Sequence, residues 1–326
     1  MIRRALVGAL AATLALAPAA KLPDVAKVVA WVTGAQTTKT LPSNLLGQLS
    51  GESNATFLAD LCLTKPGSTS AAKACAFGDT SSRQTVVLYG DSFALQWTPA
   101  LAALGTADHF KVLVYARLGC PFANIAIESY TGSVDKGCAP FRSNALKAIR
   151  ALSPKPLLVV LAEEFDRTAP GGKWGSISIG AYASAMSATL SKLPHLTVAV
   201  LQGVPAASSD PSTCLAAHPA DVTACSDAPA VAYNLPADKA FAATVKSARD
   251  STVNVSMLLC GARCPDVIDG MLVHSDEWHF DKTYVAALAP ALGSLLGCVS
   301  RAGNLSRLPA GTKSSCAASE ALSLGR

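Results

Sequence analysis

The feature that most constrains this chain is a regular alternation of short apolar runs with amphipathic helical patterns. Five runs rich in Val and Leu have the length of buried strands, at residues 85–89, 112–116, 157–161, 196–201 and 253–259. Helical periodicity fills the intervals, at residues 96–104, 139–152, 181–193 and 237–250. Such alternation is typical of a parallel sheet with helices on both faces. We therefore predict an α/β protein with a five-stranded parallel sheet.

The first run leads directly into Gly90, Asp91 and Ser92. Open parallel sheets bind their ligands at the carboxyl ends of the strands, so these residues lie where a site is expected. The glycine allows a sharp turn into a helix predicted over residues 92–104, whose first N–H groups lack helical partners and can face an oxyanion. Ser92 is therefore a candidate nucleophile, although the same tripeptide is also common in turns and helix caps.

A histidine that can activate this serine stands near the end of the chain. A serine hydroxyl is a weak nucleophile until an imidazole takes its proton and a carboxylate fixes the imidazole tautomer. Asp276 precedes His279 by three residues, so one turn can bring both side chains to the same face. The four other histidines lack this arrangement, and they are His109, His195, His218 and His274. Of these, His274 is the closest rival.

Several short motifs stand in an order that matches a known superfamily. They are Cys75-Ala76-Phe77-Gly78-Asp79, Gly90-Asp91-Ser92, Gln96-Trp97-Thr98-Pro99-Ala100-Leu101, Cys120-Pro121, Val204-Pro205 and Asp276-Glu277-Trp278-His279. With them, residues 60–298 resemble the SGNH (GDSL-type) hydrolases, and more closely the extracytoplasmic SGNH domains associated with membrane acyltransferases of bacterial cell-surface glycans. The resemblance implies a flavodoxin-like three-layer sandwich, with Ser92 as nucleophile, His279 as general base and Asp276 as its orienting partner.

The sequence departs from the family pattern at two places. Many such domains have a histidine after the serine, whereas this chain has Phe93. The family also supplies an oxyanion-hole asparagine after the third strand, where this chain reads Ala162-Glu163-Glu164-Phe165. We therefore expect the backbone N–H groups of Ser92 and Gly119 to form the oxyanion hole, with Asn124 as a further candidate donor. We interpret Glu163, Glu164 and Asp166 as a solvated loop, Trp97 as core, and Trp278 as packing the loop or stacking on a sugar.

The N-terminus has the pattern of an export signal. Arg3 and Arg4 precede an apolar run over residues 5–17, and Ala17-Pro18-Ala19 has the small residues that signal peptidase prefers. The run is shorter than the roughly 20 residues of a membrane span. We predict a signal peptide over residues 1–19 and a secreted or cell-envelope protein, with an uncleaved anchor as the alternative.

The ten cysteines point to the same compartment. An even number in an exported chain indicates disulfides. Neighbours along the chain give five pairs, which are Cys62 with Cys75, Cys120 with Cys138, Cys214 with Cys225, Cys260 with Cys264 and Cys298 with Cys316. A metal site at Cys260 and Cys264 is a rival interpretation, but no second close pair completes a four-ligand set. A further rival interpretation is that Cys120 is a nucleophile.

We divide the chain into the signal, an extension over residues 20–83, an SGNH hydrolase-like domain over residues 84–298, and a tail over residues 299–326 tied by a disulfide. The net charge of +5 falls to about +3 without Arg3 and Arg4, and no dense Lys/Arg cluster occurs. Nucleic acid is therefore not an expected partner. We expect a monomer that needs no cofactor and no metal.

Two functional hypotheses follow. The first is an exported serine enzyme that forms an acyl-enzyme and passes the acyl group to water or to a hydroxyl of a cell-envelope glycan, with a membrane acyltransferase as a candidate partner. A small acyl ester is the other candidate substrate. The second is a non-catalytic SGNH-like module that binds glycan or a membrane acyltransferase, and Phe93 and the missing asparagine motivate it. The sequence leaves hydrolysis and transfer open.

Overall fold

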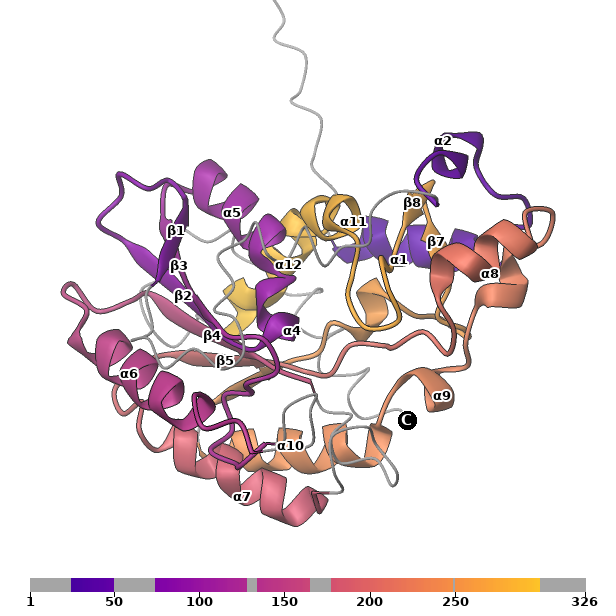
Figure 1. Ribbon diagram of the computed structural model, residues 1–326. Coiled ribbons are helices and arrows are strands. Elements are labelled where there is room, and N and C mark those ends of the chain that lie inside the picture. The colour runs from indigo at the N-terminus through magenta and orange to yellow at the C-terminus, as the bar shows by residue number, and fades with distance from the viewer. Residues whose placement is uncertain (1–24, 50–73, 128–133, 165–176, 249, 300–326) are drawn as a thin grey trace, which may run out of the picture.

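The computed structural model describes residues 25–49, 74–127, 134–164, 177–248 and 250–299. Their central element is a six-stranded sheet with helices on both faces (Figure 1), which confirms the predicted α/β architecture. The strand order is β1-β3-β2-β4-β5-β6. The strands are β1 (Cys75–Gly78), β2 (Thr85–Gly90), β3 (Lys111–Ala116), β4 (Leu158–Ala162), β5 (Val198–Leu201) and β6 (Ser251–Val253).

Strand β2 lies in the middle of the sheet and pairs in parallel with both β3 and β4. All six of its residues are buried, as are the five of β4. Continuous apolar runs of this kind are expected of strands covered on both faces. Strand β1 is a sixth strand that the sequence did not predict. It pairs antiparallel with β3 and is only partly buried, so its sequence lacks a strong apolar pattern.

The fifth predicted strand, at residues 253–259, is wrong over most of its length. Strand β6 ends at Val253, and the chain then turns into a 3-10 helix, η3 (Ser256–Leu258). The Ser256 N–H donates to Asn254 Oδ1 and so starts this turn. The apolar residues that follow are buried in the core all the same. An apolar run shows that a segment is buried, but not that it is extended.

Helices cover the two faces of the sheet in separate groups (Figure 1). One core cluster joins the sheet to α1 (Val25–Ala35), α4 (Ser92–Leu95), α5 (Thr98–Ala107), α11 (Lys282–Ala287) and α12 (Ala289–Val299). The other joins it to α6 (Cys138–Ala151), α7 (Ile179–Leu190) and α10 (Leu235–Ser247). The predicted three-layer sandwich thus has a hydrophobic core on each side of the sheet.

Part of the predicted N-terminal extension packs against the sheet layers. Helix α1 buries Val25, Val28, Val32 and Ala35, which recur at helical spacing on one face, and it contacts α12. Strand β1 also falls within residues 20–83. The domain boundaries remain predictions, and residues 1–19 and 300–326 lie outside the described residues. Among the helices of the described ranges, none combines the length and apolar character needed to cross a membrane.

A third, smaller apolar cluster lies beside the main core. Its buried members include Leu41, Leu45, Leu215, Val222 and Val267. The short elements that contribute to it are α2 (Ser43–Leu46), α8 (Pro211–Ala217), η2 (Val222–Cys225), β7 (Val267–Ile268) and β8 (Met271–Leu272). The short helix α9 (Pro229–Ala232) instead joins the main core through Ala232. Strands β7 and β8 form a hairpin, and the chain after β8 leads toward the predicted base.

Three of the predicted disulfides are present in the described part of the chain, and they are Cys120–Cys138, Cys214–Cys225 and Cys260–Cys264. Cys75 and Cys298 are also disulfide-bonded. Their predicted partners, Cys62 and Cys316, lie outside the described residues. The pairing of these two bridges therefore stays a prediction.

Removal of the Cys120–Cys138 bridge should destabilise the fold. The bridge spans 18 positions, and closing a loop of this size restricts the unfolded chain by about 3 kcal/mol in the chain-entropy model. We expect the Cys120→Ala/Cys138→Ala double variant to lose about that much of the free energy of unfolding in urea denaturation. A free energy of unfolding equal to that of the unmodified protein would show that the bridge does not stabilise the fold.

Candidate active site

Ser92 lies at the carboxyl end of the central strand. β2 ends at Gly90, and a side chain there would place its Cβ 1.8 Å from the Ala162 carbonyl oxygen of β4, so only glycine fits. Asp91 caps the following helix by accepting the Phe93 N–H at 2.9 Å. Ser92 is the first residue of α4 and is 5% exposed. The sequence motif thus places the candidate nucleophile at the end of a fixed strand.

The helix predicted over residues 92–104 is two helices. α4 ends at Leu95 and α5 begins at Thr98, with Pro99 in its first turn. A proline in the first turn needs no N–H partner, but it cannot continue a preceding helix. The break leaves Gln96 and Trp97 between the two helices, and both are fully buried. Trp97 is core, as the sequence indicated.

His279 lies in the loop between β8 and α11, where it binds Asp276. The distance from His279 Nδ1 to Asp276 Oδ2 is 2.9 Å, and the same carboxylate accepts the backbone N–H groups of Trp278 and His279. An ionised carboxylate can only accept, so Nδ1 carries the proton and Nε2 keeps its lone pair. Burial alone would raise the pKa of Asp276, but the hydrogen bonds and charge of His279 and the backbone donors lower it below its ordinary value.

The loop that carries His279 is fastened to the segment that begins with Ser92. Phe280 N donates to Gln96 Oε1 at 2.9 Å, and this hydrogen bond is buried. The rings of Phe93 and His279 lie 5.3 Å apart. His279 Nε2 is buried and has no hydrogen-bond partner among the described residues. The structure thus brings the neighbours of Ser92 against the base and leaves its basic nitrogen unpaired.

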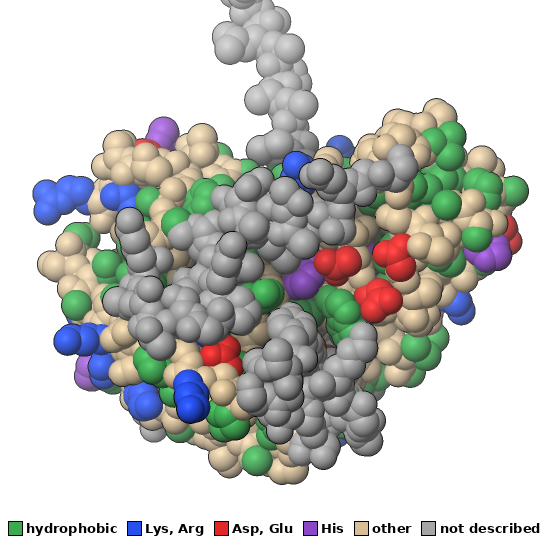
Figure 2. Space-filling model, viewed as in Figure 1, with side chains coloured by type: hydrophobic (Ala, Val, Ile, Leu, Met, Phe, Trp, Pro, Cys, Tyr) green, Lys and Arg blue, Asp and Glu red, His purple; other side chains and the backbone are tan. Residues whose placement is uncertain are grey.

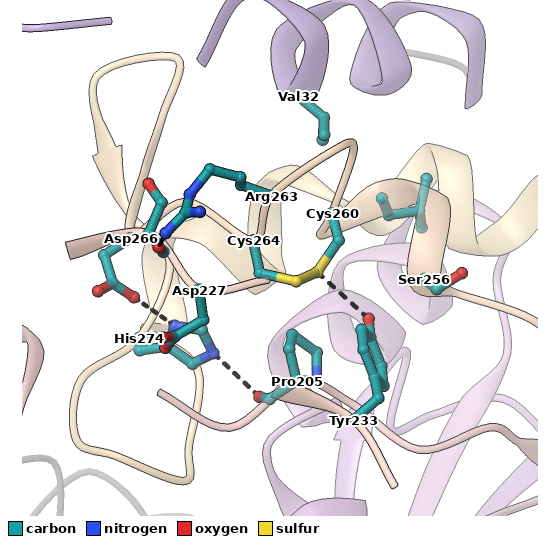
Figure 3. The surroundings of a disulfide bond; sticks show 12 residues. Val32, Pro205, Asp227, Tyr233, Ser256, Cys260, Arg263, Cys264, Asp266 and His274 are labelled. Carbon is teal, nitrogen blue, oxygen red and sulfur yellow. Dashed lines mark hydrogen bonds and ion pairs between the residues drawn. A yellow bond between two sulfur atoms is a disulfide. The ribbon is translucent and has the colours of Figure 1, made fainter. Parts of the chain in front are cut away.

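His274 is not the base, although it also pairs with an aspartate (Figure 3). It is 2% exposed, and both ring nitrogens are engaged, Nδ1 with Asp266 Oδ1 at 2.8 Å and Nε2 with the Pro205 carbonyl at 3.1 Å. Both ring nitrogens therefore face partners of their own, and neither is directed at Ser92. His274 instead ties the start of the His279 loop to the segment after β5.

The loop after β3 holds the second expected oxyanion donor. Gly119 has φ +65°, a conformation that favours glycine, and it stands directly before the disulfide-bonded Cys120. Arg142 donates to the Pro121 carbonyl, and Ala123 N donates to Glu163 Oε2 at 2.9 Å. This loop is therefore fixed by a covalent bond and by buried polar groups.

Asn124, the other candidate donor, is exposed. Its backbone N–H bonds to the Ala185 carbonyl of α7. This contact does not bring Asn124 to Ser92. The role of Asn124 in the oxyanion hole stays a prediction.

The interpretation of Glu163 and Glu164 as a solvated loop is wrong, because they are only 3% and 6% exposed. Burial raises the pKa of Glu163 well above its ordinary value, against the hydrogen bond from Ala123, and the nearby Asp91 raises it further. Glu163 Oε1 has no hydrogen-bond partner among the described residues. Glu164 N donates to Asp91 Oδ2 at 3.1 Å. Asp166 lies outside the described residues.

A pocket of about 500 Å³ opens beside the candidate triad. Phe93 lines it next to Ser92, and Glu277 and Trp278 line it next to His279. On the face of the molecule that Figure 2 shows, acidic side chains gather beside a histidine near the middle. The other lining residues are Glu163, Glu164, Gly203, Val204, Ala206, Ala207, Ser208, Ala230, Val231, Ala232, Tyr233, Asn234, Pro236 and Asp238.

The cysteine alternatives find no support in the described part of the chain. Cys120 is disulfide-bonded and fully buried, so it carries no thiolate for nucleophilic attack. Cys260 and Cys264 bond to each other (Figure 3). The described residues contain no group of three or more His, Cys, Asp or Glu side chains that could hold a metal ion.

Comparison with known proteins shows the family and the fold of the chain. A family model described as "SGNH domain (fused to AT3 domains)" matches residues 61–293. Among solved structures, the lipopolysaccharide acetyltransferase periplasmic domain of Salmonella ser. Paratyphi A has a TM-score of 0.54 at 14% identity, over 67% of this chain and 85% of that chain. At this identity the likeness is one of fold.

Two further solved structures are more distantly similar. Est24, a carbohydrate acetylesterase from Sinorhizobium meliloti, has a TM-score of 0.40 at 14% identity, over 64% of this chain and 96% of that one. A GDSL-like lipase from Bacteroides thetaiotaomicron has a TM-score of 0.39 at 12% identity, over 77% and 97%. No curated protein sequence matches the chain. On the family match over residues 61–293, the chain belongs to the SGNH domain family.

Proposed function

We propose that this protein is an extracytoplasmic serine enzyme that transfers acyl groups through an acyl-serine at Ser92, as an O-acyl esterase or O-acyltransferase of carbohydrate. The observation that carries the proposal is the His279 ring, whose Nδ1 is held by Asp276 while its buried Nε2 has no partner among the described residues. Membership of the SGNH family supports acyl chemistry in general. The disulfides support an oxidising compartment.

The first half-reaction forms the acyl-enzyme. Ser92 Oγ attacks the carbonyl carbon of an ester while His279 Nε2 takes the hydroxyl proton, and Asp276 stabilises the resulting imidazolium. The negative charge on the carbonyl oxygen falls to the backbone N–H groups of Ser92 and Gly119. When the carbon–oxygen bond to the leaving alcohol breaks, His279 returns the proton to that alcohol.

The second half-reaction releases the acyl group. Water or a sugar hydroxyl attacks the acyl-serine, His279 takes its proton, and the same proton returns to Ser92 Oγ as the ester bond breaks. Water gives a free acid and a sugar hydroxyl gives an acylated glycan. Supplying an acyl donor with and without a glycan acceptor, and identifying the products by mass, separates the two. The resemblance to domains beside membrane acyltransferases favours a membrane partner as donor if transfer occurs.

Ser92→Ala should abolish the acyl chemistry. Loss of a triad nucleophile lowers kcat by about 10³-fold or more in serine enzymes, so we expect p-nitrophenyl acetate turnover to fall by at least that factor and labelling by a fluorophosphonate probe to vanish. Ser184→Ala is the matched control, because Ser184 is an exposed residue of α7. Unchanged turnover in Ser92→Ala, with no label on the unmodified protein, would leave the non-catalytic module as the function.

The rate should fall as the pH falls, because a protonated His279 cannot accept the Ser92 proton. The pKa of Asp276 is held below its ordinary value, so Asp276 stays ionised while His279 takes up its proton. A profile of kcat/KM between pH 5 and 8 tests this, and a flat profile would contradict a histidine base. His109→Asn should leave the profile unchanged, because His109 is exposed and has a positive φ that asparagine tolerates.

Gln96 should act as a positioning residue for the base. Gln96→Met removes the acceptor for the buried Phe280 N–H while keeping the side-chain length, and we expect kcat to fall about tenfold with KM nearly unchanged. Gln96→Glu keeps an acceptor oxygen and should retain more of the activity than Gln96→Met. Equal kcat values for these two variants, both with a folded circular-dichroism spectrum, would refute the role.

A further inference from the structure

The pocket beside Ser92 and His279 has an acidic lining. Four carboxylic side chains contribute to it, from Glu163, Glu164, Asp238 and Glu277, and no Lys, Arg or His does so among the described residues. They come from three separate segments: the end of β4, the first turn of α10 and the loop that carries His279. The acidic character therefore belongs to the pocket rather than to one stretch of sequence.

One of these groups is built into the wall without a complete set of partners. Glu163 is 3% exposed. Its Oε2 accepts the Ala123 N–H and a hydrogen bond with Tyr182 also acts on the carboxyl, while its Oε1 has no partner in hydrogen-bond geometry among the described residues. An unpaired buried polar atom is costly, so a ligand hydroxyl that reaches it gains a hydrogen bond that the free protein lacks.

Two other acidic side chains, Asp238 and Glu277, line the same pocket. Burial raises the pKa of Asp238 to about 6, against the hydrogen bond from Gly203 N to its Oδ1, so Asp238 is ionised above that pH. Glu277 is half-buried, and its carbonyl accepts the Ala207 N–H, which joins the His279 loop to the opposite wall. Carboxylates accept charge-assisted hydrogen bonds from hydroxyl groups and repel anions.

The remaining lining suits a sugar ring. Trp278 and Phe93 offer aromatic surface, and an aromatic face packs well against the C–H side of a pyranose. The Tyr233 hydroxyl lies 3.6 Å from Cys260 Sγ, so it is engaged in the wall (Figure 3). Hydroxyl acceptors and aromatic surface thus lie in one pocket beside the proposed nucleophile.

We infer that this pocket selects an uncharged carbohydrate, whose hydroxyls donate to Glu163, Asp238 and Glu277, and that it excludes sugars bearing a carboxylate or phosphate. The inference rests on the proposed acyl chemistry at Ser92, and it narrows the substrate class of that site. A like charge at close range in a partly buried pocket lowers affinity by about tenfold or more at low ionic strength, and added salt weakens the effect.

The first experiment compares two substrates that differ in one charge, monoacetylated methyl glucoside and monoacetylated methyl glucuronide, by acetate release. We expect kcat/KM to be at least about tenfold higher for the glucoside at low salt. The ratio should fall in high salt, and it should grow between pH 5 and 7.5 because Asp238 loses its proton in that range. An equal or higher value for the glucuronide would overturn the inference.

A pair of matched variants tests whether the preference for the glucoside over the glucuronide arises in the pocket. Asp238→Asn removes one charge and keeps the Oδ1 acceptor for Gly203 N, so the preference for the glucoside should shrink several-fold. Asp269→Asn removes the same charge from an exposed turn between β7 and β8, where the positive φ suits asparagine, and the preference should not change. The same ratio in both variants would contradict a role for the pocket.

A binding measurement separates this inference from the proposed function. Ser92→Ala protein is titrated with methyl glucoside and with methyl glucuronide, and binding is followed by saturation-transfer NMR. Stronger binding of the glucoside supports the selective pocket even if no ester is turned over, in which case only the proposed chemistry fails. Turnover that depends on Ser92 together with equal binding of the two sugars refutes the selective pocket alone.

Discussion

The site depends on the buried carboxylate of Asp91. One of its oxygens accepts the Phe93 N–H, which starts α4, and the other accepts the Glu164 N–H, which continues β4. The carboxyl end of β2, the helix that begins with Ser92 and the end of the neighbouring strand are thereby joined at one point. Since Gly90 brings the backbones of β2 and β4 too close for any side chain, the joint has little freedom to shift. The direction of Ser92 is set by strand pairing and this one carboxylate, before any loop contributes.

The remaining parts of the site are brought to this joint by tethered loops. Gln96 holds the His279 loop to the segment that follows Ser92, and the Cys120–Cys138 bridge holds the loop of Gly119. His274 ties the His279 loop to the segment after β5 through the Pro205 carbonyl. Each tether is buried, so water competes little for its hydrogen bonds. Catalytic geometry on loops requires such support, because an error of about 1 Å at the base can cost about 10²-fold in rate.

Local sequence predicted the parts of the site that depend on local geometry. The spacing of Asp276 and His279 within one turn, and the position of Ser92 after a buried run, are properties of neighbouring residues, and the structure places them as that spacing indicates. The burial of Glu163 and Glu164 is different, because it comes from α6, α7 and the loop after β3, which are distant in sequence. Strand β1 was not predicted, and residues 253–259 were wrongly predicted to be a strand, for the same reason. Packing in three dimensions decided the conformation of both segments.

The residues after β4 also change what the site can do with charge. An ionised carboxylate near a developing oxyanion opposes catalysis, and the burial that raises the pKa of Glu163 disfavours such a charge at the end of β4. Asp238 lines the same pocket, and because its pKa is raised by burial to about 6, its charge is present at neutral pH. Under the inferred selectivity, a site of this kind discriminates against anionic sugars. In the proposed mechanism the oxyanion is left to backbone donors, so the loop of Gly119 would matter more than it would beside an asparagine.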